Sequence, residues 1–392
     1  MNTVLIDMKK CTGCRACEHI CTSGAITMSR DEEGFLFPQI DPSKCTDCGL
    51  CALTCPTENK VHVRRPLETY AAVHKDKKIL SDSSSGGVFT ALADIVLENH
   101  GTVVGCMLNG AFRAVQTAVS DPKLIPGFRG SKYVQSDTGT TYRDVEKLLK
   151  NGTCVLYTGT PCQIAGLKKY LGKEYDTLLT ADLVCHGVPS PELFIAHIRW
   201  LEEKSGQKIS EYRFRCKTAD ASSVYCYKYK FDPTQKNITG PAVLDPYYFA
   251  FLKAATYREC CYGCPYAQEN RVGDITFADY WNAEELHPEL SGINGVSMLT
   301  LNTPKALLYK PEISKRLELI PTNIEWMLER NLNLNRPARR PEERDTIYKE
   351  IQTNGYGKWA DKFCSRPKWI LRNAFEHLPV HLRTFLTRLL KN

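Results

Sequence analysis

The stretch CTGCRACEHIC, residues 11–21, decides the first part of the fold, and CTDCGLCALTC, residues 45–55, repeats its cysteine spacing. Both runs follow C-x2-C-x2-C-x3-C, which is typical of domains that hold two [4Fe-4S] clusters. Three closely spaced thiolates in a tight loop bind three irons of one cubane, and the fourth cysteine reaches back to the other cluster. The predicted ligands are Cys11, Cys14, Cys17 and Cys55 for one cluster, and Cys45, Cys48, Cys51 and Cys21 for the other.

This cysteine-rich segment is predicted to be a bacterial-type 2[4Fe-4S] ferredoxin domain over residues 1–62. An alternative is zinc bound in paired knuckles, but the C-x2-C-x2-C run favours iron–sulfur clusters. Thr22 stands where a proline usually follows the fourth cysteine, and this departure removes no ligand. Such a domain moves single electrons without substrate chemistry. We therefore expect the reaction site to lie beyond the linker at residues 60–68.

The composition excludes several classes of protein. With 392 residues, 43% of them hydrophobic and 24% charged, the chain is long enough for two or three domains and too apolar to be mainly disordered. It has no run of about 18 uncharged apolar residues that would span a membrane. The first residues lack the apolar core of a secretory signal. We expect a cytoplasmic protein, in which 18 cysteines point to metal rather than disulfides.

The net charge of +7 is concentrated near the C-terminal end. Residues 362–392 hold seven Lys and Arg against one acid, Glu376, so the rest of the chain is close to neutral. A near-neutral body argues against nucleic acid as the main partner. Segment 368–391 mixes basic with apolar residues, and Pro379 divides it into two short predicted helices. Such helices can lie on an anionic membrane surface, and the alternative is packing on the protein itself or on a partner subunit.

Strands and helices alternate after Tyr70. Strands are predicted at 69–74, 102–108, 153–159 and 177–185, and helices at 87–99, 138–150, 161–171 and 191–204. The alternation favours an α/β or α+β fold, in which helices cover a mixed, largely parallel sheet. No G-x-G-x-x-G occurs, so a standard dinucleotide-binding fold is not indicated. We predict this fold for residues 63–320 and a basic, mainly helical extension for residues 321–392.

Two cysteines follow the ends of successive predicted strands. Cys162 lies at the start of the helix after strand 153–159, and Cys185 ends the next strand. Parallel strands joined by one helix often lie side by side, so both thiols are expected in the crevice where open α/β sheets bind cofactors. The C-x2-C pair at Cys261 and Cys264 would complete a four-thiolate site. The alternatives are zinc and buried, inert cysteines.

A serine- and glycine-rich turn at residues 83–87 opens the predicted helix 87–99. Free backbone N–H groups and the positive end of the helix dipole make such a turn a good phosphate cradle. The alternative is an ordinary helix start capped by serine.

Residues from about 70 to 320 resemble the beta subunit family of coenzyme F420-reducing hydrogenases and dehydrogenases. The matching motifs are Ser85–Gly87, Gly130–Val134, Gly159–Gln163, Cys185–Gly187, Arg258–Ala267, Arg271–Trp281 and Asn294–Thr303. The resemblance implies an FAD-binding domain with its own [4Fe-4S] cluster, ligated by Cys162, Cys185, Cys261 and Cys264. It also implies a flavin site that includes Ser85, Gly86, Gly87, Lys132, Tyr133, Gly159, Thr160, Gln163 and Asp279.

Two departures from the family pattern border the expected redox centre. The usual Gly-Asp-Phe-Trp-Gly reads ADYWN at residues 278–282, and Cys260 adds a thiol that can replace Cys261 as a ligand. The substrate pocket is therefore expected to differ from that of deazaflavin-reducing members. His186 is the predicted catalytic proton donor, because its ordinary pKa suits proton transfer near neutrality. The alternative is a histidine that is hydrogen-bonded in a turn.

These features together predict an iron–sulfur flavoprotein oxidoreductase. Electrons would pass between the ferredoxin-type clusters, the third cluster and FAD, and on to a small-molecule substrate. The substrate is a deazaflavin such as coenzyme F420 or a metabolite of a sugar or polysaccharide pathway, and the direction of flow stays open. An electron donor or acceptor protein such as a ferredoxin is the expected partner. The alternative is a non-catalytic electron-transfer subunit that feeds a partner enzyme.

Two further features are interpreted without a functional role. Residues 212–217 and 225–231 alternate strictly and predict an antiparallel pair with a solvated basic face, the alternative being a patch for an acidic partner or phosphate. Five cysteines outside any motif are predicted to act as small hydrophobic side chains. They are Cys106, Cys154, Cys216, Cys226 and Cys364.

Overall fold

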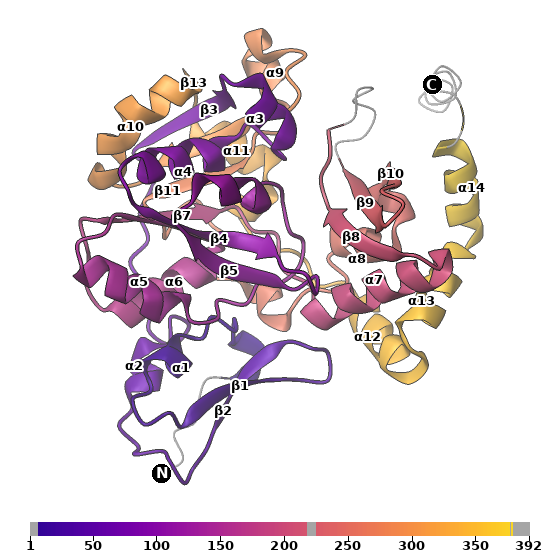
Figure 1. Ribbon diagram of the computed structural model, residues 1–392, viewed down its shortest axis with the longest axis horizontal. Helices are drawn as coiled ribbons and strands as arrows, with labels where there is room; N and C mark the ends of the chain where they lie inside the picture. Colours follow the sequence, from indigo (N-terminus) through magenta and orange to yellow (C-terminus); the bar gives the residue numbers. More distant parts are fainter. Residues whose placement is uncertain (1–6, 218–224, 377, 379–392) are drawn as a thin grey trace.

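The computed structural model describes residues 7–217, 225–376 and 378. Figure 1 shows a large sheet with helices on both faces, a small N-terminal domain, and a second small sheet with helices beside it. The strands of the large sheet lie in the order β13-β3-β12-β11-β7-β6-β4-β5. They are β3 (Glu68–His74), β4 (Thr102–Leu108), β5 (Ala114–Val119), β6 (Val155–Gly159), β7 (Leu178–Leu183), β11 (Ile275–Asp279), β12 (Ser297–Leu301) and β13 (Leu317–Pro321).

The large sheet is mixed. Strands β4, β6, β7 and β11 are parallel to their neighbours in this group, and the other four strands join through antiparallel pairs. Successive side chains of a strand point to opposite faces, so a sheet that is covered on both faces has nearly continuous apolar strands. The predicted mixed sheet with covering helices is confirmed.

Helices cover the two faces of the large sheet. On one face, Val103 and Leu156 pack with apolar residues of α4 (Val88–Glu98) and α10 (Pro304–Arg316). On the other face, the next residues of the same strands, Val104 and Tyr157, pack with α5 (Thr141–Lys150) and α6 (Pro161–Leu171). The shorter helices around this sheet are α3 (Lys77–Asp82), η2 (Pro122–Phe128), α9 (Ala283–Leu286), η5 (Pro288–Leu290), α11 (Ile324–Arg330) and η6 (Leu332–Leu334).

The N-terminal domain packs directly on helix α6. Its elements are η1 (Met8–Lys10), α1 (Ala16–Ile20), the antiparallel pair β1 (Ile26–Arg30) and β2 (Leu36–Ile40), and α2 (Leu50–Thr54). Cys14 and Ala16 are buried together with Ile164 of α6. Gly166 allows this close approach, because a Cβ there would lie 2.9 Å from the sulfur of Cys14. The contact places the first cysteine run against the helix that begins beside Cys162.

The second small sheet has the order β10-β9-β8 and its own aromatic core. Its elements are α7 (Pro191–Ser205), β8 (Lys208–Arg213), β9 (Cys226–Asp232), β10 (Asn237–Pro241), η3 (Ala242–Leu244) and α8 (Pro246–Leu252). The predicted antiparallel pairing of the two basic segments is confirmed, with Arg213 opposite Lys228. In the core, His197 lies 2.9 Å from a carboxylate oxygen of Asp245 and 2.9 Å from the hydroxyl of Tyr356.

The C-terminal segment folds back onto this second unit. It contains α12 (Glu343–Asn354), α13 (Tyr356–Cys364) and α14 (Pro367–Glu376). Helix α13 buries Tyr356, Trp359 and Phe363, and the indole of Trp369 in α14 donates to the carbonyl of Leu244. The second helix predicted for the tail falls outside the described residues, as does Pro379. In the described part of the chain, no helix is long and apolar enough to cross a membrane.

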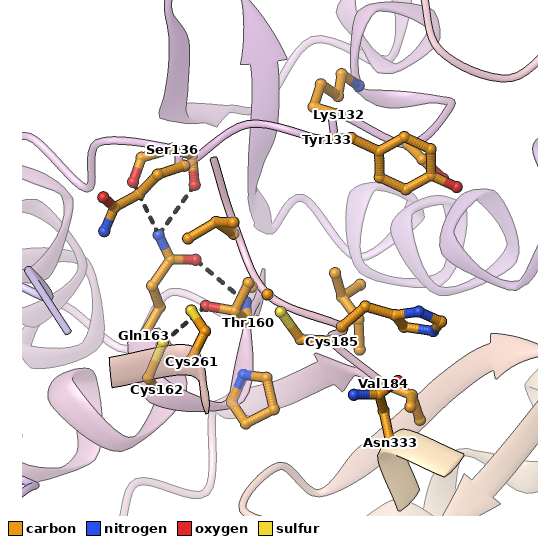
Figure 2. A pocket seen from close by; sticks show the side chains of 18 of the residues that line it. Lys132, Tyr133, Ser136, Thr160, Cys162, Gln163, Val184, Cys185, Cys261 and Asn333 are labelled. Carbon is orange, nitrogen blue, oxygen red and sulfur yellow. Dashed lines mark hydrogen bonds between the residues drawn. The ribbon is translucent and has the colours of Figure 1, made fainter. Parts of the chain in front are cut away.

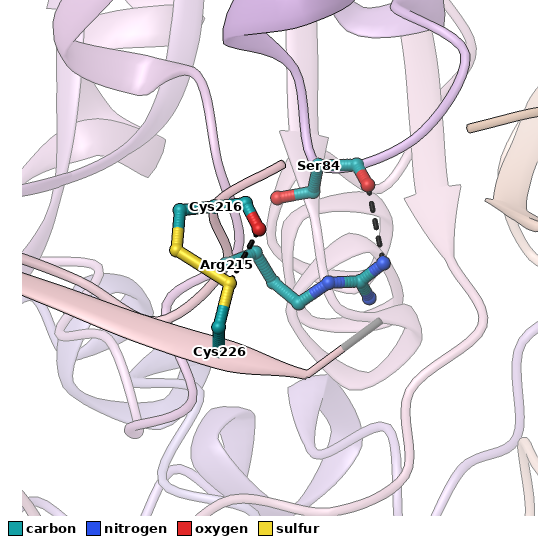
Figure 3. The surroundings of a disulfide bond; sticks show 4 residues. All are labelled: Ser84, Arg215, Cys216 and Cys226. Atoms are coloured by element: carbon teal, nitrogen blue, oxygen red, sulfur yellow. Dashed lines mark hydrogen bonds between the residues drawn. A yellow bond between two sulfur atoms is a disulfide. The ribbon is translucent and has the colours of Figure 1, made fainter. Parts of the chain in front are cut away.

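Two of the five motif-free cysteines form a disulfide, Cys216–Cys226 (Figure 3). The interpretation of these two as small hydrophobic side chains was wrong. Pairing of β8 with β9 brings both ends of the intervening segment together, which leaves their Cα atoms 5.7 Å apart, within disulfide range. Cys106, Cys154 and Cys364 are free and partly buried.

Candidate redox site

A cavity of about 1160 Å³ lies at the carboxyl ends of the parallel strands β6, β7 and β11. The N-terminus of α4, the loop at residues 128–136 and helix η4 (Glu259–Gly263) also line it. Of the predicted flavin and catalytic residues, all but Gly86 line this cavity. The cysteines in its wall are Cys106, Cys162, Cys185, Cys260, Cys261 and Cys264.

The eight cysteines of the N-terminal domain fall into two sets. Burial, together with the neighbouring Cys11 and Cys55 thiols, raises the pKa of the Cys14 thiol to about 12. Burial also raises the pKa of Cys17, and the same three cysteines are its charged neighbours. The other set, Cys21, Cys45, Cys48 and Cys51, lines one small pocket. Thus Cys55 lies with the first run and Cys21 with the second, which is the exchange that the spacing predicts.

Apart from Cys106 in β4, the cavity thiols come from three separate segments. Strands β6 and β7 pair in parallel with Gly159 opposite Asp182, so the chain leaves both strands at the same edge, towards Cys162 and Cys185. Burial raises the pKa of the Cys162 thiol, and Cys185, Cys264 and Cys260 act as nearby charges. Figure 2 shows the sulfur atoms of Cys162, Cys185 and Cys261 gathered in one part of the cavity.

Two neighbouring thiols compete for the last position of this set. Cys260 and Cys261 both line the cavity, and their side chains contact each other. The choice between them therefore stays open. Within the described residues, no three Cys, His, Asp or Glu side chains gather tightly enough to hold a metal ion. The ligands of a cubane each bind a different iron and are spread more widely than the ligands of a single ion.

Helix α4 presents an uncapped N-terminus to the cavity. Its N-cap residue, Gly87, has a φ of 87° and provides no side-chain cap. The preceding turn is tied to strand β12, because Ser85 donates its hydroxyl to the carbonyl of Val296 and Gly86 donates its N–H to the hydroxyl of Ser297. The first N–H groups of α4 are therefore the free donors, and the N–H of Gly86 is already used.

We predict that Gly86→Ala destabilises the protein by about 3 kcal/mol. A Cβ at this position would lie 2.1 Å from the carbonyl oxygen of Ala72 and 2.6 Å from the backbone nitrogen of Ser297, so the strands would have to move. Urea unfolding followed by circular dichroism measures the loss. Gly110→Ala is the matched control, since nothing lies within 4 Å of its added Cβ. Equal unfolding midpoints for both variants would contradict the prediction.

Lys132 and Tyr133 shape the wall of the cavity. The Lys132 ammonium donates to the carbonyls of Gly127, Phe128 and Arg129, and burial lowers its pKa to about 8. Its hydrogen bonds thus hold the preceding loop. Tyr133 stacks on Phe251 with ring centroids 4.2 Å apart.

Gln163 fixes the junction between β6 and α6. Its side-chain oxygen accepts from the N–H of Thr160 at 3.1 Å, and its amide donates to the hydroxyl of Ser136 at 2.9 Å. The Thr160 hydroxyl in turn lies 3.2 Å from the sulfur of Cys162. These contacts, drawn in Figure 2, orient Cys162 and leave Gln163 as a positioning residue in the cavity wall.

Arg215 is a residue of the site that sequence reasoning placed elsewhere. Its guanidinium donates to Asp279 at 2.9 Å and to the carbonyl of Ser84 at 3.1 Å, and its side chain is 6% exposed. Strand β8 ends at Arg213, so the alternation on which a solvated basic face depended stops there. Lys217 likewise points inward and donates to the carbonyls of Leu80 and Ser85. The expectation of one solvated face was wrong for both residues.

His186 lies in the cavity wall near Arg215 and Asp279. Burial lowers the pKa of its imidazole, with Asp279 opposing the shift and Arg215 adding to it. The neutral ring is therefore favoured near neutral pH.

A buried ion pair supports the strand ends. Arg271 donates to Asp182 at 3.0 Å, and their side chains are 2% and 0% exposed. Asp182 also accepts from the N–H of Gly273 and the hydroxyl of Thr276. This network ties β7 to β11, three residues before Cys185. Asp182 carried no signal in the sequence, whereas Arg271 belonged to a recognised motif.

Two segments of the chain match known protein families. Residues 152–322 match the C terminus of the coenzyme F420 hydrogenase/dehydrogenase beta subunit, and residues 10–59 match the 4Fe-4S dicluster domain. Residues 152–322 therefore belong to the coenzyme F420 hydrogenase/dehydrogenase beta subunit family, and residues 10–59 form a 4Fe-4S dicluster domain. An uncharacterized ferredoxin of Methanocaldococcus jannaschii is 35% identical over 54 residues, which cover 14% of this chain and 69% of the ferredoxin.

A solved structure with a similar chain is the F420-reducing [NiFe] hydrogenase complex from Methanosarcina barkeri. The likeness has a TM-score of 0.44 and 16% identity, and it covers 76% of this chain and 93% of the other. The part that matches the beta subunit family runs from just before β6 to the end of β13 and contains Asp279 and every cavity cysteine except Cys106. The α4 turn and the loop with Lys132 lie before it. The dicluster domain makes this family member an iron–sulfur electron-transfer protein.

Proposed function

We propose that this protein is an iron–sulfur flavoprotein oxidoreductase, with a third [4Fe-4S] cluster and FAD in the large cavity. The observation that carries the proposal is the shared cavity itself. Thiols from three segments and the uncapped N-terminus of α4 open into it, and the dicluster domain packs on the helix beside it. We further propose the division into residues 1–62, 63–320 and 321–392, and a cytoplasmic location.

The residues present fit both groups chemically. Cys162, Cys185, Cys264 and either Cys260 or Cys261 supply four thiolates, the ligand set of a cubane. The free N–H groups at the start of α4 suit the phosphates of FAD. Bound FAD would take up electrons singly from clusters and exchange a hydride with a substrate.

The chain's own groups have distinct proposed roles. Tyr133 forms an apolar wall that excludes water, and Arg215, held by Asp279 and Ser84 of the cavity wall, provides a fixed positive charge beside the cavity. His186 would hold a proton for transfer to substrate or flavin, since a buried neutral imidazole can accept and then donate one. A deazaflavin such as coenzyme F420, or a sugar-pathway metabolite, is the proposed substrate. A ferredoxin-like carrier is the proposed protein partner.

Anaerobically purified protein should contain about twelve iron and twelve acid-labile sulfide per chain, because three cubanes are proposed. Elemental analysis, a sulfide assay and chromatography of the extracted flavin measure this, and one FAD per chain is expected. Air should bleach the visible spectrum as the clusters are oxidised. An iron content of about eight per chain would rule out the third cluster, and a colourless protein that contains zinc would overturn the whole proposal.

Turnover by the isolated chain tests the enzymatic part. Anaerobic protein with a reduced ferredoxin-type donor is expected to reduce a small molecule, first tested with coenzyme F420. Cofactor-loaded protein that exchanges electrons with carriers but reduces no candidate substrate would favour the electron-transfer subunit instead.

A further inference from the structure

Arg258 joins the dicluster domain to the cavity through a buried guanidinium. Its side chain is among the largest that are fully buried, with the residue 1% exposed. Nε donates to the carbonyl of Cys11 at 2.7 Å and Nη2 to the carbonyl of Leu36 at 2.9 Å. Nη1 donates to the side-chain oxygen of Gln135 at 3.1 Å. One guanidinium therefore holds two backbone points of the N-terminal domain.

Gln135 completes this grip on the first cysteine loop. Its amide donates to the carbonyl of Thr12 at 2.9 Å. Gly13 makes the close approach possible, since a Cβ there would lie 3.0 Å from both Nη1 of Arg258 and Nε2 of Gln135. With a φ of +69°, Gly13 also adopts a conformation that glycine tolerates best. The loop of the first cluster is thus clamped from the cavity side.

The backbone of Arg258 is hydrogen-bonded to the segments that carry the cavity thiols. Its carbonyl accepts from the N–H of Cys261 at 2.9 Å, and its own N–H donates to the carbonyl of Val188 at 2.9 Å. Arg258 is the residue before η4, which carries Cys260 and Cys261. One residue therefore fixes the distance between the Cys11 loop and the cavity thiols.

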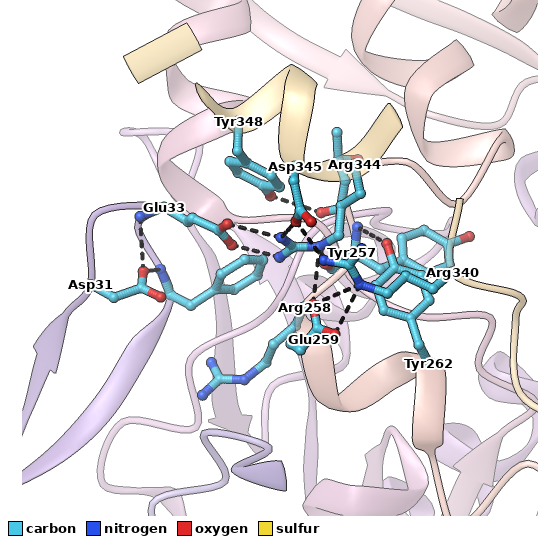
Figure 4. Close-up of polar contacts among 12 residues, drawn as sticks. Asp31, Glu33, Tyr257, Arg258, Glu259, Tyr262, Arg340, Arg344, Asp345 and Tyr348 are labelled. Atoms are coloured by element: carbon cyan, nitrogen blue, oxygen red, sulfur yellow. Dashed lines mark hydrogen bonds and ion pairs between the residues drawn. The ribbon is translucent and has the colours of Figure 1, made fainter. Parts of the chain in front are cut away.

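Among the residues that the structure describes, no carboxylate pairs with the charge of Arg258. In the described parts of the chain, its guanidinium donates to carbonyl and amide oxygens and lies within hydrogen-bond reach of the Cys260 sulfur, and it forms no ion pair with a carboxylate. Figure 4 shows this guanidinium apart from the neighbouring ion pairs, in which Arg344 meets Glu33 and Arg340 meets Glu259. A buried charge is unfavourable unless an opposite charge compensates it. Cys11 and Cys260, one from each thiol set, are both close enough to interact with it electrostatically.

We propose that Arg258 is a positioning residue that holds the Cys11 loop against the cavity thiols and is the counter-charge shared by two neighbouring clusters. The inference rests on the third cluster proposed above. Each cluster gains negative charge on reduction, so a shared cation stabilises both reduced forms and raises both midpoint potentials.

The test is an anaerobic redox titration of the full chain, followed by electron paramagnetic resonance. In Arg258→Gln, one ferredoxin-type cluster and the third cluster should each show a roughly tenfold lower ratio of reduced to oxidised form at fixed potential, a shift of about 59 mV. The other ferredoxin-type cluster serves as the internal reference and should not move. Arg258→Lys keeps the charge and should restore most of both shifts.

Arg344→Gln is the matched control. Arg344 is also buried and also reaches the N-terminal domain, but its partners are Glu33, Glu259 and Asp345 and not the Cys11 loop, so all midpoints should shift far less than in Arg258→Gln. Unchanged midpoints in Arg258→Gln with full iron content would overturn the proposal. If only one ferredoxin-type cluster shifts and the protein holds about eight irons, the third cluster does not exist, and Arg258 acts on the Cys11 cluster alone.

If Arg258→Gln does not fold, a second variant tests the proposal. Gln135→Leu keeps the charge and removes one side of the clamp, so amide hydrogen exchange at residues 11–13 should quicken by about tenfold while both midpoints stay in place. Unchanged hydrogen exchange in Gln135→Leu would overturn the proposal. Midpoints in Arg258→Lys that fall as far as those in Arg258→Gln would also overturn it.

Discussion

Cys162→Ala should lose about four of twelve irons while both ferredoxin-type clusters survive. The structure gives the reason. Cys162 lies in the first turn of α6 within the cavity wall, its sulfur faces the hydroxyl of Thr160, and Cys185 and Cys264 are its charged neighbours. A cubane that loses one thiolate of a buried set has no substitute at this position. Iron and sulfide analysis, with electron paramagnetic resonance of the reduced protein, measures the loss.

Electron transfer to FAD should also change when Cys162→Ala loses its iron. Reduction of FAD by way of the ferredoxin-type clusters should slow by at least about 100-fold, the scale on which a lost catalytic group acts, whereas direct reduction by substrate should persist. Cys154→Ala is the control, because this free cysteine lies outside the cavity wall and meets the hydroxyl of Tyr309. Full iron in Cys162→Ala, or equal losses in both variants, would remove Cys162 from the ligand set.

Arg271→Met should destabilise the protein by about 3–5 kcal/mol, because it leaves the buried carboxylate of Asp182 without its cation. Asp182 is fully buried, and its other partners, such as Gly273 N–H and the Thr276 hydroxyl, cannot neutralise the charge. Urea unfolding followed by circular dichroism measures the change. Iron content should fall as well, since Cys185 follows the strand that this pair anchors.

Arg65→Ala provides the comparison for this loss. Arg65 pairs with Glu325 at 3.0 Å, but their side chains are 62% and 63% exposed, so water screens the pair and the change should be within about 0.5 kcal/mol. If Arg271→Met unfolds at the same urea concentration as Arg65→Ala, the buried pair does not anchor β7 to β11.

Much of the large sheet could be predicted because local signals agree with tertiary packing. The strand at 102–108 and the helix at 161–171 have the predicted bounds. The second of these carries its own start and stop, a proline at its first position and Gly172 in a left-handed conformation after its end. The order of strands could not be predicted, because β3 enters the sheet between β12 and β13, which come more than 200 residues later.

The site was predictable where spacing or a motif marks a residue, and not where contacts are made across the chain. The cysteine runs can be recognised from their spacing alone, but Arg215 and Asp182 act through partners on distant segments. The Cys216–Cys226 disulfide could not be predicted for the same reason, since only the pairing of β8 with β9 brings the two cysteines together. Predictions of the flavin residues and of the third cluster's ligands stay predictions.

The contact at Gly166 makes the position of the dicluster domain depend on a specific fit between two surfaces. Gly166 follows Cys162 by four residues, a rise of about 6 Å along α6, and the sulfur of Cys14 lies where its side chain would be. A freely diffusing carrier would have to recreate this fit at each encounter. The fused domain is therefore not an exchangeable module, and swapping in an unrelated ferredoxin should fail unless its first cysteine loop matches the surface around Gly166.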